Sequence, residues 1–540
     1  MLNLLTDAWL PVIRRHTGRC AIRPAQIAER HESNPVIAVD WPRPDFRIAT
    51  LEFLIGLLTT VFPPAGGDAW LSLWSEPPEP AELDEAFAPF AHAFALDGDG
   101  PRFLQDQEDL QSAAQPIERL LIEAPGDATT SKNTDLLVHR NRVASVGRAA
   151  AAMALYTFQS WAPAGGAGNR VGLRGGGPLL TLVMPGPAPT LWQAVWANVS
   201  EGGTALTQNE LPRVFPWLAA TVTSEGGTVV APQTAHPLQC WWSMPRRIRL
   251  DFVRTAMPRP CDLTGEIADV EVVSWRQRPH GASYAFWGGV HPLTPHYQQK
   301  IGSEKLSLHP QPGGIGYRHW LGLVVGLPDG SRTPAASVSH WHDGFRGRNA
   351  GIPCARLIAA GYDMDNMKAR GFVESEMPLP SAPGKTARTA LDDLAKRLVE
   401  AAEEVAGQLR SAVRNALFSA GATVKPDAGV LNAVRERFWE ETELRFFAML
   451  TSAADQAGEA SVGERMGWRD HLRDVALRLF DEAAPLSADT GWSAAARTGK
   501  ARRMLGISLA GFGPVGTQLL ITLALPAVES KATKKKRHAA

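Results

Sequence analysis

The sequence is poor in cysteine, and the few cysteines it has are widely separated. Cys20, Cys240, Cys261 and Cys354 form no CxxC pair. This spacing argues against a zinc ribbon and against a disulfide scaffold, and it fits a reducing compartment. The first residues, MLNLLTDAWLPV, show no basic region followed by a long apolar core. We therefore expect no signal peptide and a cytoplasmic location.

The short motifs of common enzymes are also missing. The sequence has no GxSxG, HExxH or P-loop GxxxxGK[ST] pattern, and no dinucleotide fingerprint after a clear strand. The nearest candidate is HWHD, in which His340, His342 and Asp343 could serve a metal-dependent hydrolase. The alternative is a polar loop that holds two histidines. Nothing else points to catalysis, so we expect a chain that is not an enzyme and has no cofactor.

Size and charge leave the class of partner open. With 540 residues the chain is too long for a single core to be the default, so we expect two or more domains. Apolar residues make up 44% and charged residues 20%, which fits a folded protein. Lys+Arg and Asp+Glu are equal at 55 each, so net charge neither supports nor excludes nucleic acid.

The pattern of residues divides the chain into two regions. Residues 1–376 mix short β-like runs, such as 178–184 and 246–253, with loops rich in Gly and Pro. They predict a large, irregular α+β domain. Residues 377–385, MPLPSAPGK, indicate a linker. From 386 to 540 apolar residues recur at helical spacing between charged ones, which predicts a C-terminal all-α bundle of four-helix type.

One stretch of this second region is unusual because Met504 to Val528 carries no charge. Its length would allow a membrane span, and Arg502, Arg503 and the tail KKKR (534–537) flank it. Several glycines and Pro514 interrupt it, which favours a buried bundle helix or an irregular segment. A membrane-tethered scaffold is the alternative.

Three loops have chemistry suited to a nucleic-acid backbone. The first, 163–178, holds seven glycines in sixteen residues, so its main chain can approach a ligand closely, and Arg170 and Arg174 could contact phosphates. The second, 131–148, holds four basic residues and one acid, Asp135. The alternative is a flexible hairpin region for the first loop and a solvated basic loop for the second.

The third loop is the tip of GYDMDNMKAR, residues 361–370. Asn366 could bond the acceptors of the minor groove, and Met367 is an apolar wedge able to enter a base step. Lys368 and Arg370 would neutralise nearby phosphates. The alternative is a helix-to-turn junction with ordinary surface polarity.

Together these motifs resemble one family, the CasA large subunits of the type I-E CRISPR complex Cascade. The matching segments cover most of the first 450 residues, and no one of them would suffice. They are NLLTDAWLPV (3–12), PRFLQD (101–106), KNTDLLVHR (132–140), VGLRGGGP (171–178), MPRRIRLDF (244–252), HPLTPHY (291–297) and GYDMDNMKAR (361–370).

The resemblance implies a non-catalytic function in antiviral defence. Members of this family lie near the 5′ handle of the CRISPR RNA, read the protospacer-adjacent motif (PAM) of duplex DNA from the minor groove, and help to open the duplex for R-loop formation. They then recruit a helicase–nuclease. Base pairing with the guide reads the remaining sequence. The implied partners are the backbone and small subunits, the RNA handle, duplex target DNA and the helicase–nuclease, with no membrane. The C-terminal bundle is expected to contact the small subunits.

The resemblance also assigns roles to residues. The glycine loop against the minor groove corresponds to Gly165, Gly166, Ala167, Gly168, Asn169 and Arg170. The wedge corresponds to Asp365, Asn366, Met367 and Lys368, and the loop near the RNA handle to Leu137, Val138, His139 and Arg140. A basic groove contact falls on Arg278 or Arg276. Some relatives carry further cysteines near Cys261 that could bind metal, and because this chain lacks them we expect no zinc.

Overall fold

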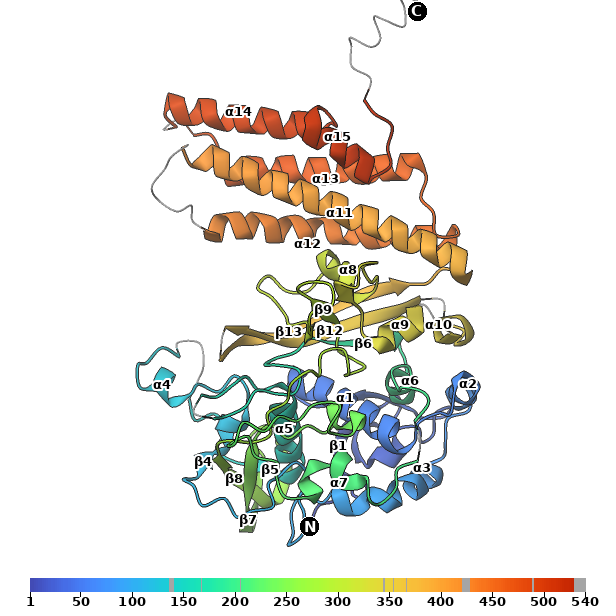
Figure 1. Ribbon diagram of the computed structural model, residues 1–540, viewed down its shortest axis with the longest axis vertical. Helices are drawn as coiled ribbons and strands as arrows, with labels where there is room; N and C mark the ends of the chain where they lie inside the picture. Colours follow the sequence, from blue (N-terminus) through green and yellow to red (C-terminus); the bar gives the residue numbers. More distant parts are fainter. Residues whose placement is uncertain are drawn as a thin grey trace, which may run out of the picture. The chain divides into compact units, whose positions relative to one another are not determined.

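The computed structural model divides the chain into two compact units. One comprises Met1–Gly314 with Gly322–Leu379, and the other Ile315–Leu321 with Pro380–Ala540. The first mixes helices with several small antiparallel sheets and the second is helical, which confirms the expected fold class (Figure 1). The residues described are 1–135, 140–166, 168–203, 205–342, 345–352, 354–365, 367–419, 428–487 and 490–528.

The strands of the first unit form four separate sheets. Their orders are β2-β1-β3, β10-β9-β11, β13-β12-β6 and β4-β8-β5, with β7 paired to β8. The strands are β1 (Leu10–Arg14), β2 (Gly18–Ile22), β3 (Val36–Val39), β4 (Gln115–Pro116), β5 (Val146–Gly147), β6 (Leu180–Pro185), β7 (Arg247–Pro260), β8 (Ile267–Arg278), β9 (His296–Gln298), β10 (Lys305–Ser307), β11 (Arg332–Thr333), β12 (Cys354–Asp365) and β13 (Lys368–Pro380).

The helices of this unit are mostly short. The α-helices are α1 (Pro44–Val61), α2 (Gly67–Ser75), α3 (Pro80–Phe87), α4 (Asp127–Thr130), α5 (Arg148–Trp161), α6 (Leu191–Trp196), α7 (Leu211–Val214), α9 (Ala336–His342) and α10 (Phe345–Asn349). The 3₁₀ turns are η1 (Pro24–Gln26), η2 (Ala88–Ala93), η3 (Ile117–Leu120), η4 (Pro216–Leu218) and η5 (Pro237–Cys240). Two further elements, η6 (Tyr317–His319) and α8 (Trp320–Leu323), occur where the chain passes from one unit to the other and back.

The core of the first unit forms around α1, which is apolar on nearly all sides. Phe53, at its centre, is fully buried and meets five aromatic rings edge-on, among them Tyr156 of α5 at 5.6 Å and Trp242 at 5.8 Å. Edge-to-face contacts of this kind add to the area that the rings bury. The end of α5, where the glycine-rich loop begins, is thereby fixed to the core.

A buried ion pair ties the following segment to the same core. Arg174 donates to the Glu52 carboxylate of α1, which also accepts from the Trp161 indole at 3.1 Å, and His291 lies 3.2 Å from it. Burial raises the pKa of Glu52, but Arg174 and His291 outweigh that effect and leave it below its ordinary value. Arg174 is only 4% exposed. The expectation that it contacts phosphates is therefore wrong, because its charge is neutralised inside the protein.

The second unit is built from α11 (Gly384–Leu417), α12 (Ala428–Asp455), α13 (Val462–Ala483), α14 (Trp492–Leu509) and α15 (Gly513–Thr522). In Figure 1, α11, α12, α13 and α14 lie side by side with similar axes. The ring of Tyr317 stacks on Phe446 of α12 at 4.5 Å, and its hydroxyl lies 2.7 Å from the Thr442 hydroxyl. Residues 315–321 therefore pack as part of the helical unit, far in sequence from the rest of it.

The uncharged stretch 504–528 forms the end of one helix and a second, shorter helix. α14 ends at Leu509, the backbone turns at Gly511 with φ of +94°, and α15 begins at Gly513. Counted through this break, Trp492–Thr522 is long and apolar enough to cross a membrane, with a mean hydropathy of 1.5 over 18 residues, of which 33% are buried. The ten residues of α15 span roughly 15 Å, half of a bilayer core. This geometry favours two bundle helices.

Candidate nucleic-acid interface

The glycine loop is a tight turn that leaves the end of α5. The Gly165 amide donates to the Asn169 carbonyl at 3.2 Å, and the Asn169 amide donates to the Gly166 carbonyl at 2.8 Å. Gly166 and Gly168 adopt φ of +67° and +82°, a region that side chains disfavour. A Cβ at Gly166 would meet no atom within 4 Å, so the main chain is open to approach there. Ala167 lies outside the described residues.

A buried arginine, Arg246, holds this turn through hydrogen bonds to its main chain. The Arg246 guanidinium donates to the carbonyls of Pro163 and Arg170, the latter at 2.6 Å, and lies 5.3 Å from the centre of the Phe158 ring. Burial lowers its pKa to about 10, and no carboxylate of the described residues lies within ion-pair distance. Because its partners are neutral, Arg246 leaves positive charge behind the loop. It belongs to MPRRIRLDF, yet nothing in the sequence separates its role from that of neighbouring Arg247.

Side chains from distant segments hold the rest of the loop. Asn169 accepts a hydrogen bond from the Gln277 amide at 2.8 Å, and Arg170 donates to the Ser224 hydroxyl at 2.8 Å. The His280 amide donates to the Gly168 carbonyl at 2.9 Å, and a Cβ on Gly168 would lie 2.8 Å from the His280 ring. Over the described ranges, no carboxylate lies within 4 Å of Arg170, so no ion pair within the chain offsets its positive charge.

The second candidate segment is the tip of a long β-hairpin. β12 ends at Asp365 and β13 begins at Lys368, so Met367 lies in the short connection between these two paired strands. The interpretation as a helix-to-turn junction is wrong, because β12 pairs with β6 from Ala355 to Ala360. Met367 is 56% exposed. Asn366 lies outside the described residues.

Charge at the tip is partly neutralised. Arg370 pairs with Asp363 at 2.7 Å across the hairpin, and this hydrogen bond raises the pKa of Arg370. The structure gives Lys368 no such partner among the residues it describes. Of the two residues expected to contact phosphates, Arg370 is paired within the chain, and Lys368 is therefore the more available for a phosphate.

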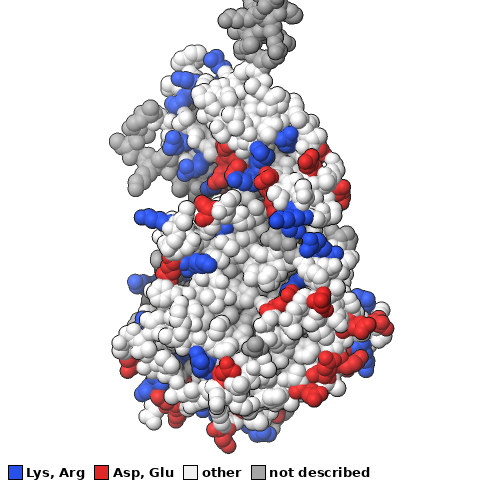
Figure 2. All heavy atoms as spheres, turned by 45° about the vertical axis from the view of Figure 1, so that its right-hand side comes forward, with Lys and Arg blue, Asp and Glu red and all other residues white. Residues whose placement is uncertain are grey.

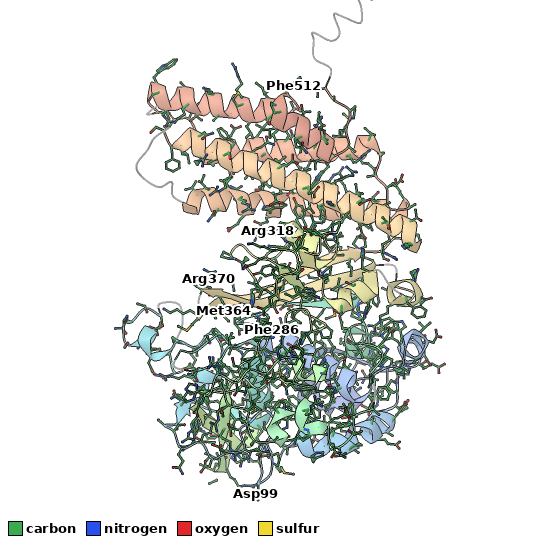
Figure 3. All side chains as sticks on the ribbon, in the orientation of Figure 1. Asp99, Phe286, Arg318, Met364, Arg370 and Phe512 are labelled. Carbon is green, nitrogen blue, oxygen red and sulfur yellow. The ribbon has the colours of Figure 1, made fainter. Side chains whose placement is uncertain are left out.

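The end of the glycine-rich segment 163–178 packs both on the start of the glycine loop and on the last residues of β12, near the hairpin tip. A Cβ on Gly176 would lie 2.8 Å from Pro163, which starts the glycine loop. A Cβ on the next residue, Gly177, would lie 2.6 Å from the Tyr362 carbonyl and 3.0 Å from the Met364 side chain of β12. Figure 3 labels Met364 and Arg370 on this hairpin. Two of the three predicted segments are therefore brought together by close glycine packing.

Residues 3–479 match the family described as CRISPR-associated protein Cse1. The chain belongs to the Cse1 family. This is the family of the large subunit of type I-E Cascade, so the resemblance to CasA seen in the sequence is confirmed.

Solved structures agree over nearly the whole chain. CasA of Thermus thermophilus is 18% identical, with 94% of this chain and 99% of that one covered at a TM-score of 0.65. Cse1 of Thermobifida fusca is 16% identical, with 97% and 98% covered at 0.67. A chain of a structure described as a CRISPR RNA-guided surveillance complex is 16% identical, with 93% and 99% covered at 0.65. At these identities the likeness establishes the shared fold.

The expected RNA-handle loop of this Cse1-family chain is only partly described. Leu137, Val138 and His139 lie outside the described residues. Arg140 pairs with Asp135 of its own loop and donates to the Thr130 carbonyl at 2.9 Å. The hydrogen bond to Asp135 raises the pKa of Arg140. Contact with RNA would thus have to compete with this internal pair.

The two candidate groove residues lie on β8, whose end touches the glycine loop through Gln277. Arg276 is 3.2 Å from Asp251, and Arg278, at the end of the strand, is 3.8 Å from Glu108. Side chains alternate along a strand, so both arginines leave the face opposite to Gln277. The structure does not bring them directly against the glycine loop.

The candidate metal site offers a poor environment for a cation. His340 and His342 lie on α9, and burial and the nearby Arg346 lower the pKa of His340. Within the described ranges no three His, Cys, Asp or Glu side chains gather as a metal site requires. Asp343 lies outside those ranges.

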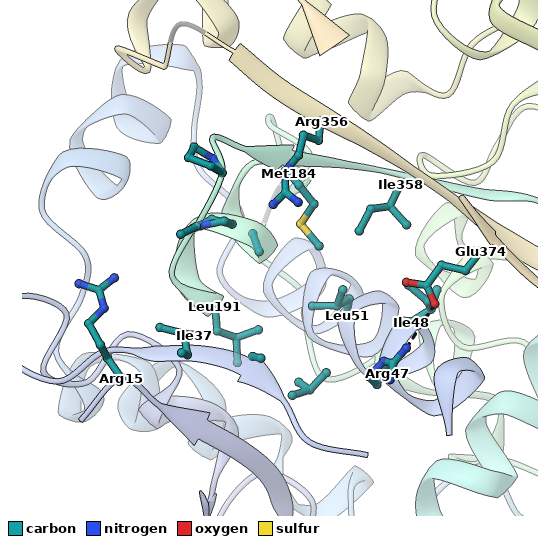
Figure 4. Close-up of a pocket in the computed structure, with 16 residues that line it drawn as sticks. Arg15, Ile37, Arg47, Ile48, Leu51, Met184, Leu191, Arg356, Ile358 and Glu374 are labelled. Carbon is teal, nitrogen blue, oxygen red and sulfur yellow. Dashed lines mark hydrogen bonds and ion pairs between the residues drawn. The ribbon is translucent and has the colours of Figure 1, made fainter. Parts of the chain in front are cut away.

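A surface pocket of about 390 Å³ lies elsewhere on the first unit (Figure 4). Its floor is apolar, and Arg15, Arg47 and Arg356 border it, with Arg47 3.5 Å from Glu374. The lining contains one carboxylate and no His, Cys or Ser, so it offers no pair of nucleophile and base. On the face drawn in Figure 2, basic side chains of this unit are scattered and acidic ones gather on one side, so that face is no continuous cationic surface.

Proposed function

We propose that this chain is the subunit of a CRISPR RNA-guided surveillance complex that reads the PAM from the minor groove and opens the DNA. The observation that carries this function is that Gly176 and Gly177 pack the segment of the glycine turn against the last residues of β12, which lead to the exposed hairpin tip. A bare main chain fits a narrow groove, and an apolar tip can pry a base step.

The glycine loop suits the reading step. Gly166 is open to approach, Arg170 has no ion-pair partner among the described residues, and Arg246 adds positive charge behind the turn. Such a surface would hold the DNA backbone while the turn meets the base edges. The minor groove carries a degenerate code, so a short motif is what such a contact can read.

The hairpin tip suits the opening step. Met367, in the connection between β12 and β13, is 56% exposed, so more than half of this apolar side chain remains available to a ligand. Inserting it would cost a few kcal/mol of base unstacking, which guide pairing then offsets. Asn366 beside it would bond the base edges that the wedge disturbs.

The remaining parts of the proposal concern partners. One solved relative by fold is a chain of an RNA-guided surveillance complex, which supports assembly with other subunits and a DNA target. Residues 137–140 would approach the 5′ handle of the guide RNA, the helical unit would contact the small subunits, and the assembled complex would recruit the helicase–nuclease. Catalysis would then belong to that partner.

The test compares two substrates with one variant. Asn366→Ala combined with Met367→Ala should slow R-loop formation on duplex target at least tenfold, since a few kcal/mol of unstacking are no longer assisted. Binding to a target that is already unpaired should stay unchanged. R-loop formation is measured on the assembled complex by permanganate reactivity of the displaced strand.

A matched control comes from another hairpin of the same unit. Met257 on β7 is 79% exposed, and Met257→Ala should leave both substrates unaffected. Equal loss on duplex and pre-opened targets would reject the wedge.

A further inference from the structure

An exposed aromatic ring lies on a strained backbone in the segment that follows His280, a residue in contact with the glycine loop. Phe286 is 59% exposed and adopts φ of +65°. A bulky side chain disfavours this left-handed conformation, which glycine adopts freely. Phe286 therefore lowers the stability of the folded chain in two ways: its backbone is strained, and its apolar ring remains in water. Burial of the Phe286 ring offsets little of either effect, because the ring is mostly exposed.

The neighbours of Phe286 impose this conformation. The Ala285 amide donates to the Val230 carbonyl at 3.2 Å, and the Trp287 indole donates to the same carbonyl at 2.9 Å. Trp287 itself is 2% exposed and packs on the Tyr284 ring at 6.0 Å. The chain is thus fixed on both sides, and the ring of Phe286 is held out of the core.

The segment that carries Phe286 connects the glycine loop with strand β10. It starts at His280, which packs on Gly168 of the glycine loop. It ends at Gly288, where a Cβ would lie 1.8 Å from the Lys305 carbonyl of β10. In the view of Figure 3, Phe286 is labelled beneath the hairpin that carries Met364.

The charge around this segment suits a nucleic acid. Residues 279–290 contain no Asp or Glu. Lys305 is exposed, and in the part of the chain that the structure describes it has no carboxylate within 4 Å. An exposed aromatic ring and a cation without an ion-pair partner are the kinds of group that bind single-stranded nucleic acid.

We propose that Phe286 is a stacking platform for a base that becomes unpaired where the duplex opens next to the glycine loop. This inference rests on the proposed function, since it requires DNA at that loop. A base has a flat aromatic face whatever its identity, so the platform would hold the opened strand without reading its sequence. Stacking would slow re-annealing and so favour guide pairing.

The test distinguishes the role of the Phe286 ring in DNA opening from the effect of its backbone strain on stability. Phe286→Gly relieves the left-handed strain, so the thermal stability of the chain should be unchanged or higher. The same variant should slow R-loop formation by the assembled complex about 5- to 100-fold, the loss expected for one base stack. A 2-aminopurine base placed at the opened junction should be quenched by the wild-type complex and brighter with Phe286→Gly.

Two further variants distinguish stacking from an apolar contact with a protein. Phe286→Trp should restore both the rate and the quenching, and Phe286→Leu should behave like Phe286→Gly. Ile301→Gly, at a 76% exposed apolar residue, should leave the rate and the quenching unchanged.

The outcomes keep this inference apart from the proposed function. If Phe286→Gly opens DNA at the wild-type rate, or Phe286→Leu performs as well as wild type, stacking is overturned while the wedge result stands. If the Asn366 and Met367 variant shows no duplex-specific defect, the proposed function fails whatever Phe286 does.

Discussion

The glycine loop permits a sharp test through a single methyl group. Gly166→Ala places a Cβ where no atom of the chain lies within 4 Å, so it creates no clash within the protein. Any ligand that approaches the main chain at this point must meet the new methyl. We expect duplex binding to weaken at least tenfold, equivalent to about 1.4 kcal/mol.

The effect of Gly166→Ala on the stability of the fold is expected to come from the backbone conformation alone. At φ of +67° an alanine costs about 1–2 kcal/mol, reduced by the entropy that alanine removes from the unfolded chain, about 0.4–1 kcal/mol. Gly330 provides a matched control, with φ of +71° and also no atom within 4 Å of its Cβ. Gly330→Ala should show the same small loss of stability with unchanged DNA binding.

The assay is fluorescence anisotropy of labelled duplex with the assembled complex at one fixed salt concentration, since phosphate contacts depend on salt. Thermal unfolding of each variant reports stability. Gly168→Ala should lose both stability and binding, because its Cβ would lie 2.8 Å from His280. If Gly166→Ala binds DNA as well as Gly330→Ala, the glycine loop does not approach DNA at this residue, and the reasoning is refuted.

Two further predictions concern the buried ion pair. Glu52→Gln leaves the Arg174 charge uncompensated and should lower the free energy of unfolding by about 3–5 kcal/mol, and Arg174→Met in the same chain should recover part of it, as measured by chemical denaturation. Burial and Arg174 lower the pKa of His291 from 6.5 to about 4, so the unfolded chain takes up the proton first. Stability should therefore fall by up to about 1.4 kcal/mol per pH unit as pH drops from 6.5 to 4. His291→Gln should flatten this slope, and an unchanged slope would exclude His291 as its source.

The helical unit is predictable from sequence because a single amphipathic face decides it. Leu391, Leu394, Leu398, Val405 and Leu409 recur at helical spacing, and all are buried along α11. The segment 315–321 escaped prediction because its packing on α12 depends on contacts more than 100 residues away. No local pattern marks such a contact.

The hairpin was harder to predict for a different reason. In β12 the residues from Leu357 to Tyr362 are nearly all buried, so the alternation that identifies a half-exposed strand is absent. A short, continuous apolar run is compatible with a helix or with a buried strand. The turn at 366–367 lacks the Asn-Gly or Asp-Gly signature of short hairpins. The tip itself was singled out by the chemistry of its residues, and the resemblance assigned it the role of a wedge.

The two glycine runs of 163–178 look alike in sequence but differ in what surrounds them. Gly176 and Gly177 lack a Cβ because other backbones occupy that space, those of Pro163 and Tyr362. Gly166 has no such neighbour. Composition predicts that a backbone will be approached closely, but only the tertiary packing tells which partner approaches. Here the second run is filled from within the chain, whereas Gly166 in the first run is left open to a ligand.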